Sequence, residues 1–150
     1  MKNEVLDFAL IHNLHYGTDR INSACKGIAM INRTEAVVTI VGTSGTATTR
    51  DQIVGLVDGI YLDYDTSAPS TVDLAVAENS VKYPQTILTK LNTNSDQWYY
   101  PRKPLVSGVD GSALSGPVDF YNVNDFLTFT ISQAVEGQVY RAVVLWDDLK

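Results

Sequence analysis

The chain has 150 residues, enough for one globular domain with a core of its own. Seventeen acidic against eleven basic residues give a formal net charge of −6, which disfavours a nucleic acid or an anionic membrane as the main partner. The single cysteine excludes an intrachain disulfide, and no stretch has the apolar length of a membrane span. The composition therefore predicts a globular protein made and kept in a reducing compartment.

Residues 1–35 differ in character from the rest of the chain and are expected to form an N-terminal arm. Val5, Phe8 and Ile11 recur at the spacing of one face of a short amphipathic helix, and a polar run follows them. The apolar run contains an acidic residue and precedes no small-residue cleavage site, which argues against a signal peptide. We expect Val5 and Phe8 to contact a partner.

From residue 35 onward the apolar residues follow a period of two, which predicts β-strands. The strongest alternation is FLTFTISQ, in which Leu127, Phe129 and Ile131 share one face. Roughly seven to nine short strands separated by turn signals, with no long helical pattern, indicate an all-β domain over residues 36–150. We expect a single β-sandwich, or a jelly-roll-like or partly closed barrel.

The segment QIVGLVDGIYLDYD, residues 52–65, contains two strand-like pieces around Asp58-Gly59, which predicts either a hairpin turn or a bulge. Asp58, Asp63 and Asp65 are oxygen donors of the type that calcium binds. No calcium-loop spacing accompanies them, and a solvated acidic strand end is the alternative. We expect no cofactor and keep these three aspartates as a calcium candidate.

Nucleophile, base and orienting residue types occur together in one group, His12, His15, Asp19 and Cys25. A reactive thiol needs a histidine within hydrogen-bond distance, and the arm is the segment where such geometry is hardest to hold. The spacing of these residues also matches none of the usual zinc patterns. GTSGT, residues 42–46, lacks the last glycine of a nucleophile elbow. The sequence therefore predicts no enzyme and no catalytic residue.

Three adjacent aromatic residues, Trp98, Tyr99 and Tyr100, precede a run of two prolines and two basic residues. In a strand, Trp98 and Tyr100 should point to one face and Tyr99 to the other. Proline cannot donate to a sheet ladder, so the strand should end there or lie at an edge. We expect one or two rings to pack in the core. We also predict that the stretch, with Arg102 and Lys103, contacts a partner, because aromatic residues and arginine are enriched at interfaces.

The order YYPRKPLVSGVDGSAL, then PVDFYNVNDF, then the hairpin LTFTISQAVEGQVYRAVVLW resembles small β-rich structural proteins of tailed bacteriophages, of the head decoration or cement type. The resemblance covers about residues 86–146. It implies a protein without an active site that binds the major capsid protein lattice from outside, as a trimer or dimer. It also implies a location in the virion after assembly in the host bacterial cytoplasm.

Two other functions remain open at this point. A head–tail connector or tail component would form rings of higher order than a trimer. A carbohydrate-binding β-sandwich would present coplanar, exposed rings at Trp98, Tyr99 or Tyr121, with calcium at the Asp63 cluster. All three alternatives are non-enzymatic binding functions, and none of them needs a nucleic acid or a membrane.

Overall fold

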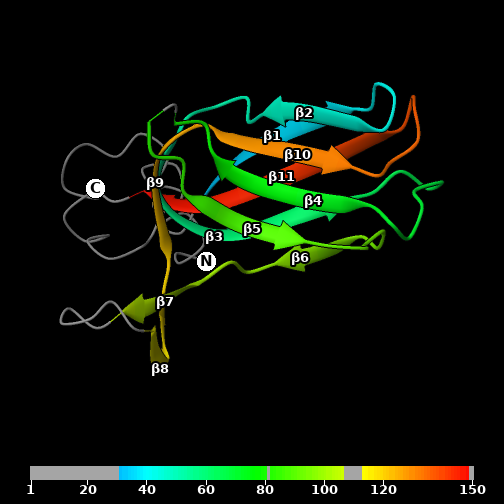
Figure 1. Ribbon diagram of the computed structural model, residues 1–150. Helices are drawn as coiled ribbons and strands as arrows, with labels where there is room; N and C mark the ends of the chain where they lie inside the picture. Colours follow the sequence, from blue (N-terminus) through cyan, green and yellow to red (C-terminus); the bar gives the residue numbers. More distant parts are fainter. Residues whose placement is uncertain (1–30, 81, 107–112, 149–150) are drawn as a thin grey trace, which may run out of the picture.

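The computed structural model describes residues 31–80, 82–106 and 113–148, which form eleven β-strands and no helix (Figure 1). The all-β class predicted from the period of two is confirmed. None of these residues belongs to a helix of the length and apolarity that would cross a membrane.

Sheet A has the strand order β1-β11-β3-β6, and β9 pairs with the first half of β3. All of its strand pairs are antiparallel, and β11, which is largely apolar on both faces, lies between two neighbours. The strands of sheet A are β1 (Ile31–Thr39), β3 (Ile53–Asp63), β6 (Gln97–Tyr99), β9 (Tyr121–Asp125) and β11 (Val139–Asp148).

Sheet B has the strand order β2-β10-β4-β5, again antiparallel throughout. It packs against sheet A to give a β-sandwich (Figure 1). The strands of sheet B are β2 (Ser44–Thr48), β4 (Asp73–Glu78), β5 (Thr86–Lys90) and β10 (Leu127–Ser132).

One apolar core lies between the two sheets and is formed by alternate residues of their strands. The alternation of FLTFTISQ is confirmed, because Leu127, Phe129 and Ile131 are all fully buried in β10. Sheet A meets them with alternate residues of its central strands, among them Val57 and Val144. The core therefore follows directly from the period of two in the sequence.

Asp58-Gly59 forms a bulge inside one continuous strand. The register pairs Leu145 with Gly59 but Trp146 with Val57, so Asp58 is an extra residue in β3. The buried positions of β3 change there from odd to even numbers. Because a bulge adds one residue to one strand only, both halves of β3 keep their apolar side toward the core.

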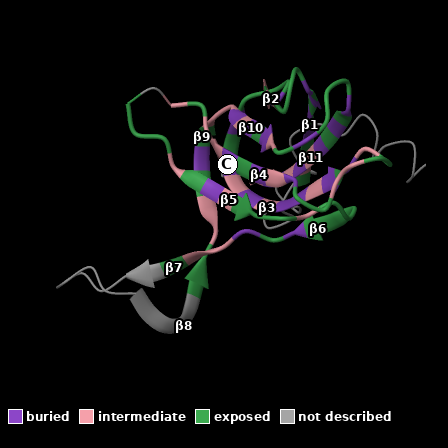
Figure 2. Cartoon of the chain, turned by 45° about the vertical axis from the view of Figure 1, so that its right-hand side comes forward, coloured by how far each residue is buried: buried purple, intermediate pink, exposed green. Residues whose placement is uncertain are grey.

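The strands β7 (Lys103–Val106) and β8 (Ala113–Asp119) form a separate antiparallel sheet. Figures 1 and 2 show this hairpin projecting from the sandwich instead of packing on either sheet. A two-stranded hairpin without a second layer is marginally stable by itself. Contacts between the hairpin and the sandwich are therefore needed to fix the position of the hairpin.

Strand β1 begins at Ile31, so residues 31–35 of the expected arm are in fact part of sheet A. The alternation was hidden there because the buried position is polar. Thr34 is 1% exposed, and its hydroxyl donates to Asp51 Oδ2 at 2.9 Å and accepts from Asp51 N at 3.1 Å. The rest of the arm lies outside the described residues, and with it the expected helix and the candidates Val5, Phe8, His12, His15, Asp19 and Cys25.

Candidate functional site

The outer face of sheet A, which is turned away from sheet B, carries large apolar side chains. The register places Tyr61 of β3 between Val143 of β11 and Trp98 of β6, so these side chains form one row across three strands. Leu145 and Tyr100 flank this row. We call Tyr61, Trp98, Tyr100, Val143 and Leu145 the apolar face.

Trp98 lies at the centre of the aromatic part of the apolar face. Its ring centroid is 5.3 Å from that of Tyr61, at an interplanar angle of 47°, and 6.3 Å from that of Tyr100, at 19°. Gly59 leaves room for these rings, since a Cβ there would lie 3.3 Å from the Trp98 ring and 3.4 Å from the Tyr100 ring. Trp98 is 40% exposed and Tyr100 is 62% exposed. Exposed aromatic clusters of this kind are typical of contact surfaces.

A shallow hollow of about 250 Å³ opens beside Trp98 on this face. It is lined by Tyr61, Val143, Leu145 and Trp98, and by Arg33 from the edge strand β1. Arg33 and Leu145 are opposite each other in the register, which brings a charged side chain to the border of an apolar surface. An apolar centre with a charged rim is the usual composition of a protein interface.

Tyr99 points to the other side of the sheet and belongs to the core. It is 7% exposed, its hydroxyl accepts a hydrogen bond from Gln97 Nε2 at 2.6 Å, and Lys90 Nζ lies 5.1 Å from its ring centroid. The predicted orientations are therefore confirmed, with one ring inside and two outside. Of the three aromatics assigned to a partner surface, Trp98 and Tyr100 are accessible and Tyr99 is not.

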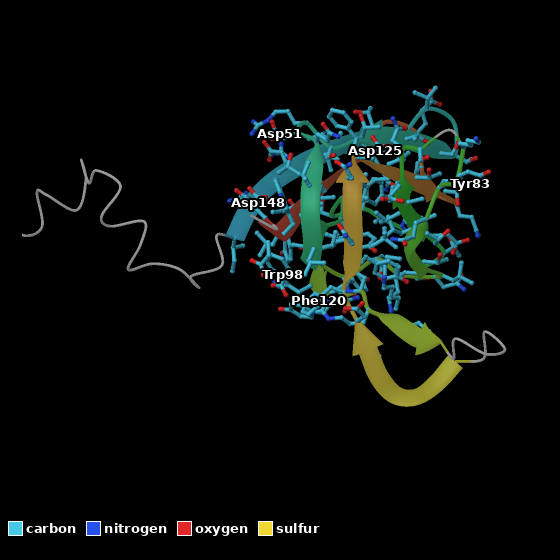
Figure 3. The ribbon with its side chains drawn as sticks, turned by 90° about the vertical axis from the view of Figure 1, so that its left-hand side faces the viewer. Asp51, Tyr83, Trp98, Phe120, Asp125 and Asp148 are labelled. Atoms are coloured by element: carbon cyan, nitrogen blue, oxygen red, sulfur yellow. The ribbon has the colours of Figure 1, made fainter. Side chains whose placement is uncertain are left out.

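Arg102 is held by contacts within its own chain. One guanidinium nitrogen donates to the backbone oxygens of Asp58 at 3.0 Å and Pro101 at 2.8 Å, and the other lies 3.4 Å from Asp58 Oδ1. The guanidinium also stacks on Phe120, 3.9 Å from the ring centroid. Because Arg102 precedes β7 and Phe120 follows β8, these contacts fasten both ends of the hairpin to the bulge of β3. Figure 3 shows Phe120 at the base of the hairpin. The carboxylate that Arg102 meets is thus Asp58 of its own chain.

Lys103 lies at the base of the hairpin. Its Nζ is 3.9 Å from Asp119 Oδ2, and the two residues are opposite each other in the β7–β8 register. Both side chains are partly exposed, so this ion pair contributes at most about 1 kcal/mol. Val118, the next residue of β8, is 59% exposed. The base of the hairpin therefore offers both charged and apolar groups to a partner.

The three aspartates of the calcium candidate lie in different surroundings. Asp58 pairs with Arg102, and Asp63 lies opposite Arg141 in the register. Asp65 accepts hydrogen bonds from Ser67 and from the backbone of Val139, which hold the pKa of its carboxyl below the usual value. Within residues 31–80, 82–106 and 113–148, no group of three or more His, Cys, Asp or Glu side chains is arranged to hold a metal ion. The calcium candidate is therefore not supported by the described geometry.

Four residues of this surface were not predicted from the sequence: Tyr61, Val143, Leu145 and Arg33. The signal that could have found them is the apolar character of both faces of β11. A strand with two apolar faces usually has a packed layer on each side. In the described part of the chain, β11 has such a layer on the side of sheet B.

Comparisons of the chain with protein-family models, with curated proteins and with solved structures found no match. Two surfaces of the described structure are candidates for a functional contact, the apolar face and the projecting β7–β8 hairpin. Both are suited to contact with a macromolecule, because one is apolar and exposed and the other extends beyond the body of the protein.

Proposed function

We propose that this chain is a non-enzymatic structural protein of a tailed-phage virion, which binds the outer capsid lattice as a decoration or cement protein. The observation that carries the proposal is the β7–β8 hairpin, which forms a two-stranded sheet of its own and projects from the sandwich (Figure 1). The hairpin is formed by YYPRKPLVSGVDGSAL and the residues after it, the same stretch that resembles the phage proteins.

The attachment of the hairpin supports a binding role. Arg102 bonds to Asp58 of β3 and stacks on Phe120, the residue that follows β8. Both strands of the hairpin are therefore held at its base. A segment that is held in position before binding loses less conformational entropy when it binds. Its uncovered strand edges offer backbone groups that can add to a sheet of a neighbouring subunit. The tyrosine-proline-arginine element would thus set the direction of the hairpin.

A capsid lattice as partner fits these features. A repeated lattice presents the same contact many times, so an oligomer of this chain gains avidity from several small contacts. We therefore propose a trimer or dimer on the major capsid protein lattice, located in the virion after assembly in the bacterial cytoplasm. The net charge of −6 gives no support to a nucleic acid or membrane partner.

Capsid co-sedimentation with two matched variants tests this proposal. Val118 in the hairpin is 59% exposed and Val135, in the turn before β11, is 55% exposed, so Val118→Asp and Val135→Asp each add one charge to an exposed position. We expect Val118→Asp to weaken capsid binding by about tenfold or more, since each 1.4 kcal/mol lost at a contact is a factor of ten. Val135→Asp should bind like the unchanged chain. Equal binding of both variants, or no binding of the unchanged chain, would contradict the proposal.

A head–tail connector or tail component is separated from this function by the oligomer size. Mass photometry of the purified chain should give a dimer or trimer for the decoration function. A closed ring of higher order would assign the chain to the connector or tail instead.

A carbohydrate-binding function is the second candidate, and the near-parallel Trp98 and Tyr100 rings favour it. Of the other rings that were predicted to contact a sugar, Tyr99 is buried, and Tyr121 packs against the core and is partly buried. A glycan array read with and without calcium tests this function. Tyr83 is 77% exposed on another loop and serves as the control. Loss of glycan binding in Trp98→Ala but not in Tyr83→Ala would establish the carbohydrate-binding function.

A further inference from the structure

The outer side of sheet A leaves several large apolar side chains exposed. Trp98, Tyr100 and Val37 are 40%, 62% and 48% exposed on the outer side of sheet A. The hollow beside Trp98 is open, and none of the described residues fills it. An exposed aromatic cluster beside an open apolar hollow is a candidate contact surface.

We propose that the N-terminal segment of the same chain, residues 1–15, packs on the apolar face through Val5 and Phe8. The point of attachment carries the argument. Thirty residues precede Ile31, the first residue of β1, and β1 is the edge strand that borders the apolar face. Arg33, two residues further along, already lines the hollow beside Trp98. The chain thus enters the described structure at the border of the uncovered surface.

The dimensions of the segment match those of the face. The strands β1, β11, β3 and β6 span about 14 Å at the usual spacing of neighbouring strands. An α-helix over residues 4–14, which the spacing of Val5, Phe8 and Ile11 predicts, would be about 16 Å long. The residues between 15 and 31 could extend for about 50 Å, so the connection is long enough for any placement on the face.

The tether favours the segment of the same chain over that of a second copy. Attachment within one chain can give the tethered segment an effective concentration in the millimolar range. A second copy at micromolar concentration competes poorly against it. The inference also gives one explanation for Val5, Phe8, Trp98 and Tyr100, which the sequence analysis had assigned to a partner surface without pairing them.

This inference is independent of the proposed capsid function, because the capsid contact is assigned to the hairpin and not to the apolar face. Loss of capsid binding in Val118→Asp would leave the inference unchanged. Conversely, an uncovered apolar face would leave the capsid proposal unchanged.

Acrylamide quenching of tryptophan fluorescence in the full chain tests the inference. Trp98 lies on the apolar face, whereas Trp146 is 8% exposed in the core, so quenching reports mainly on Trp98. The test variant is Val5→Asp with Phe8→Asp. The matched control is Asn3→Asp with Asn13→Asp, which adds the same charge to the same segment at positions that are already polar. Trp98→Phe identifies the signal of Trp98.

We expect the quenching constant of Trp98 to rise about twofold in the test variant and to stay unchanged in the control, because only the first removes the apolar cover. The difference should vanish in the Trp98→Phe background. Equal quenching in the test variant and the control would overturn the inference. Quenching of the unchanged chain that rises on dilution would also overturn it, by assigning the cover to a second copy. Protection of Trp98 by a soluble oligosaccharide would overturn it in favour of a sugar.

Discussion

The outer faces of the two sheets differ in chemistry although both follow the same alternation. The outer face of sheet B is built from small and hydroxyl-bearing residues, and its exposed or half-exposed positions include Thr46, Thr48, Ala75, Ala77, Thr128 and Thr130. The outer face of sheet A carries the apolar face instead. Threonine keeps a high strand propensity while its hydroxyl remains compatible with water. The outer face of sheet B is therefore suited to contact with water, and the outer face of sheet A is less so.

The two faces use the same cross-strand pairing with different side chains. In sheet B, Thr130 lies opposite Thr46, and their hydroxyls are 3.5 Å apart. In sheet A, Tyr61 lies opposite Trp98, and their rings are in contact. Threonine pairs and aromatic pairs both stabilise a sheet, but the aromatic pair leaves apolar surface exposed. The difference singles out the outer side of sheet A as the more apolar of the two outer surfaces.

The largest effect is expected on the inner side of sheet B, where burial differs most between neighbours. Phe129 is 1% exposed and Thr130, the next residue of β10, is exposed. Phe129→Ala should lower the free energy of unfolding by about 3–5 kcal/mol through loss of buried surface and formation of a cavity. Thr130→Ala should change it by less than about 0.5 kcal/mol. Urea unfolding measures both, and similar losses would show that the outer face of sheet B is also packed.

A second pair of variants exchanges the chemistry of the two outer faces. Tyr61→Thr with Leu145→Thr makes sheet A resemble sheet B and should cost about 1–3 kcal/mol, because both side chains are partly buried. Thr128→Val with Thr130→Val makes sheet B resemble sheet A. It should leave the thermal midpoint nearly unchanged and lower the solubility. If the two double variants behave alike in calorimetry and in solubility, the distinction between the faces does not hold.

A third prediction concerns the base of the hairpin, next to the apolar face. Arg102→Gln should cost about 1–2 kcal/mol, because it removes a half-buried ion pair and the stacking on Phe120. Arg50, whose side chain is 69% exposed in its ion pairs, is the matched control, and Arg50→Gln should cost less than about 0.5 kcal/mol. Hydrogen exchange should show faster exchange in β7 and β8 for Arg102→Gln. Unchanged hydrogen exchange in β7 and β8 would show that Arg102 does not anchor the hairpin.

The smallest difference in the free energy of unfolding is expected between variants of two tyrosines inside the sandwich. The Tyr140 hydroxyl donates to Gln138 Oε1 at 2.7 Å, whereas the buried Tyr64 hydroxyl has no hydrogen-bond partner among the described residues. Tyr140→Phe should therefore cost about 1 kcal/mol and Tyr64→Phe close to nothing, as denaturant titration at pH 7 can show. A larger loss in Tyr64→Phe would mean that its hydroxyl is satisfied.

The same two tyrosines predict a loss of stability in alkali. Burial raises the pKa of Tyr64 and of Tyr140 above the usual value for tyrosine. The unfolded chain then releases these protons at a lower pH than the folded chain, so the stabilisation is complete below about pH 10 and is lost as the pH rises further. Chemical denaturation from pH 8 to pH 11 measures this slope. In Tyr64→Phe the slope above pH 10 should be smaller, and an unchanged slope would contradict the assignment.

Several features could be predicted because they depend on neighbours in the sequence. The period of two in FLTFTISQ places Leu127, Phe129 and Ile131 on one buried face, whatever the partner strand is. The opposite orientations of Tyr99 and its two neighbours follow from the same geometry. The all-β class needs nothing more than the sum of such local patterns.

Other features depend on which strands pair, and these were beyond local patterns. Asp58-Gly59 fits a turn or a bulge equally well, and pairing with β11 on both sides of it decides for the bulge. Arg102 was predicted to contact a partner, but the carboxylate that it meets is 44 residues away in its own chain. No spacing in the sequence could distinguish Asp58 from a carboxylate on a partner.

The sequence by itself determined the class of fold and the inner face of each strand, because a strand that alternates apolar and polar residues can bury only one side in water. The tertiary structure decided the apolar face and the direction of the hairpin. Tyr61, Trp98 and Val143 come from three distant parts of the chain, and only the register of β3 with β6 and β11 brings them into one row.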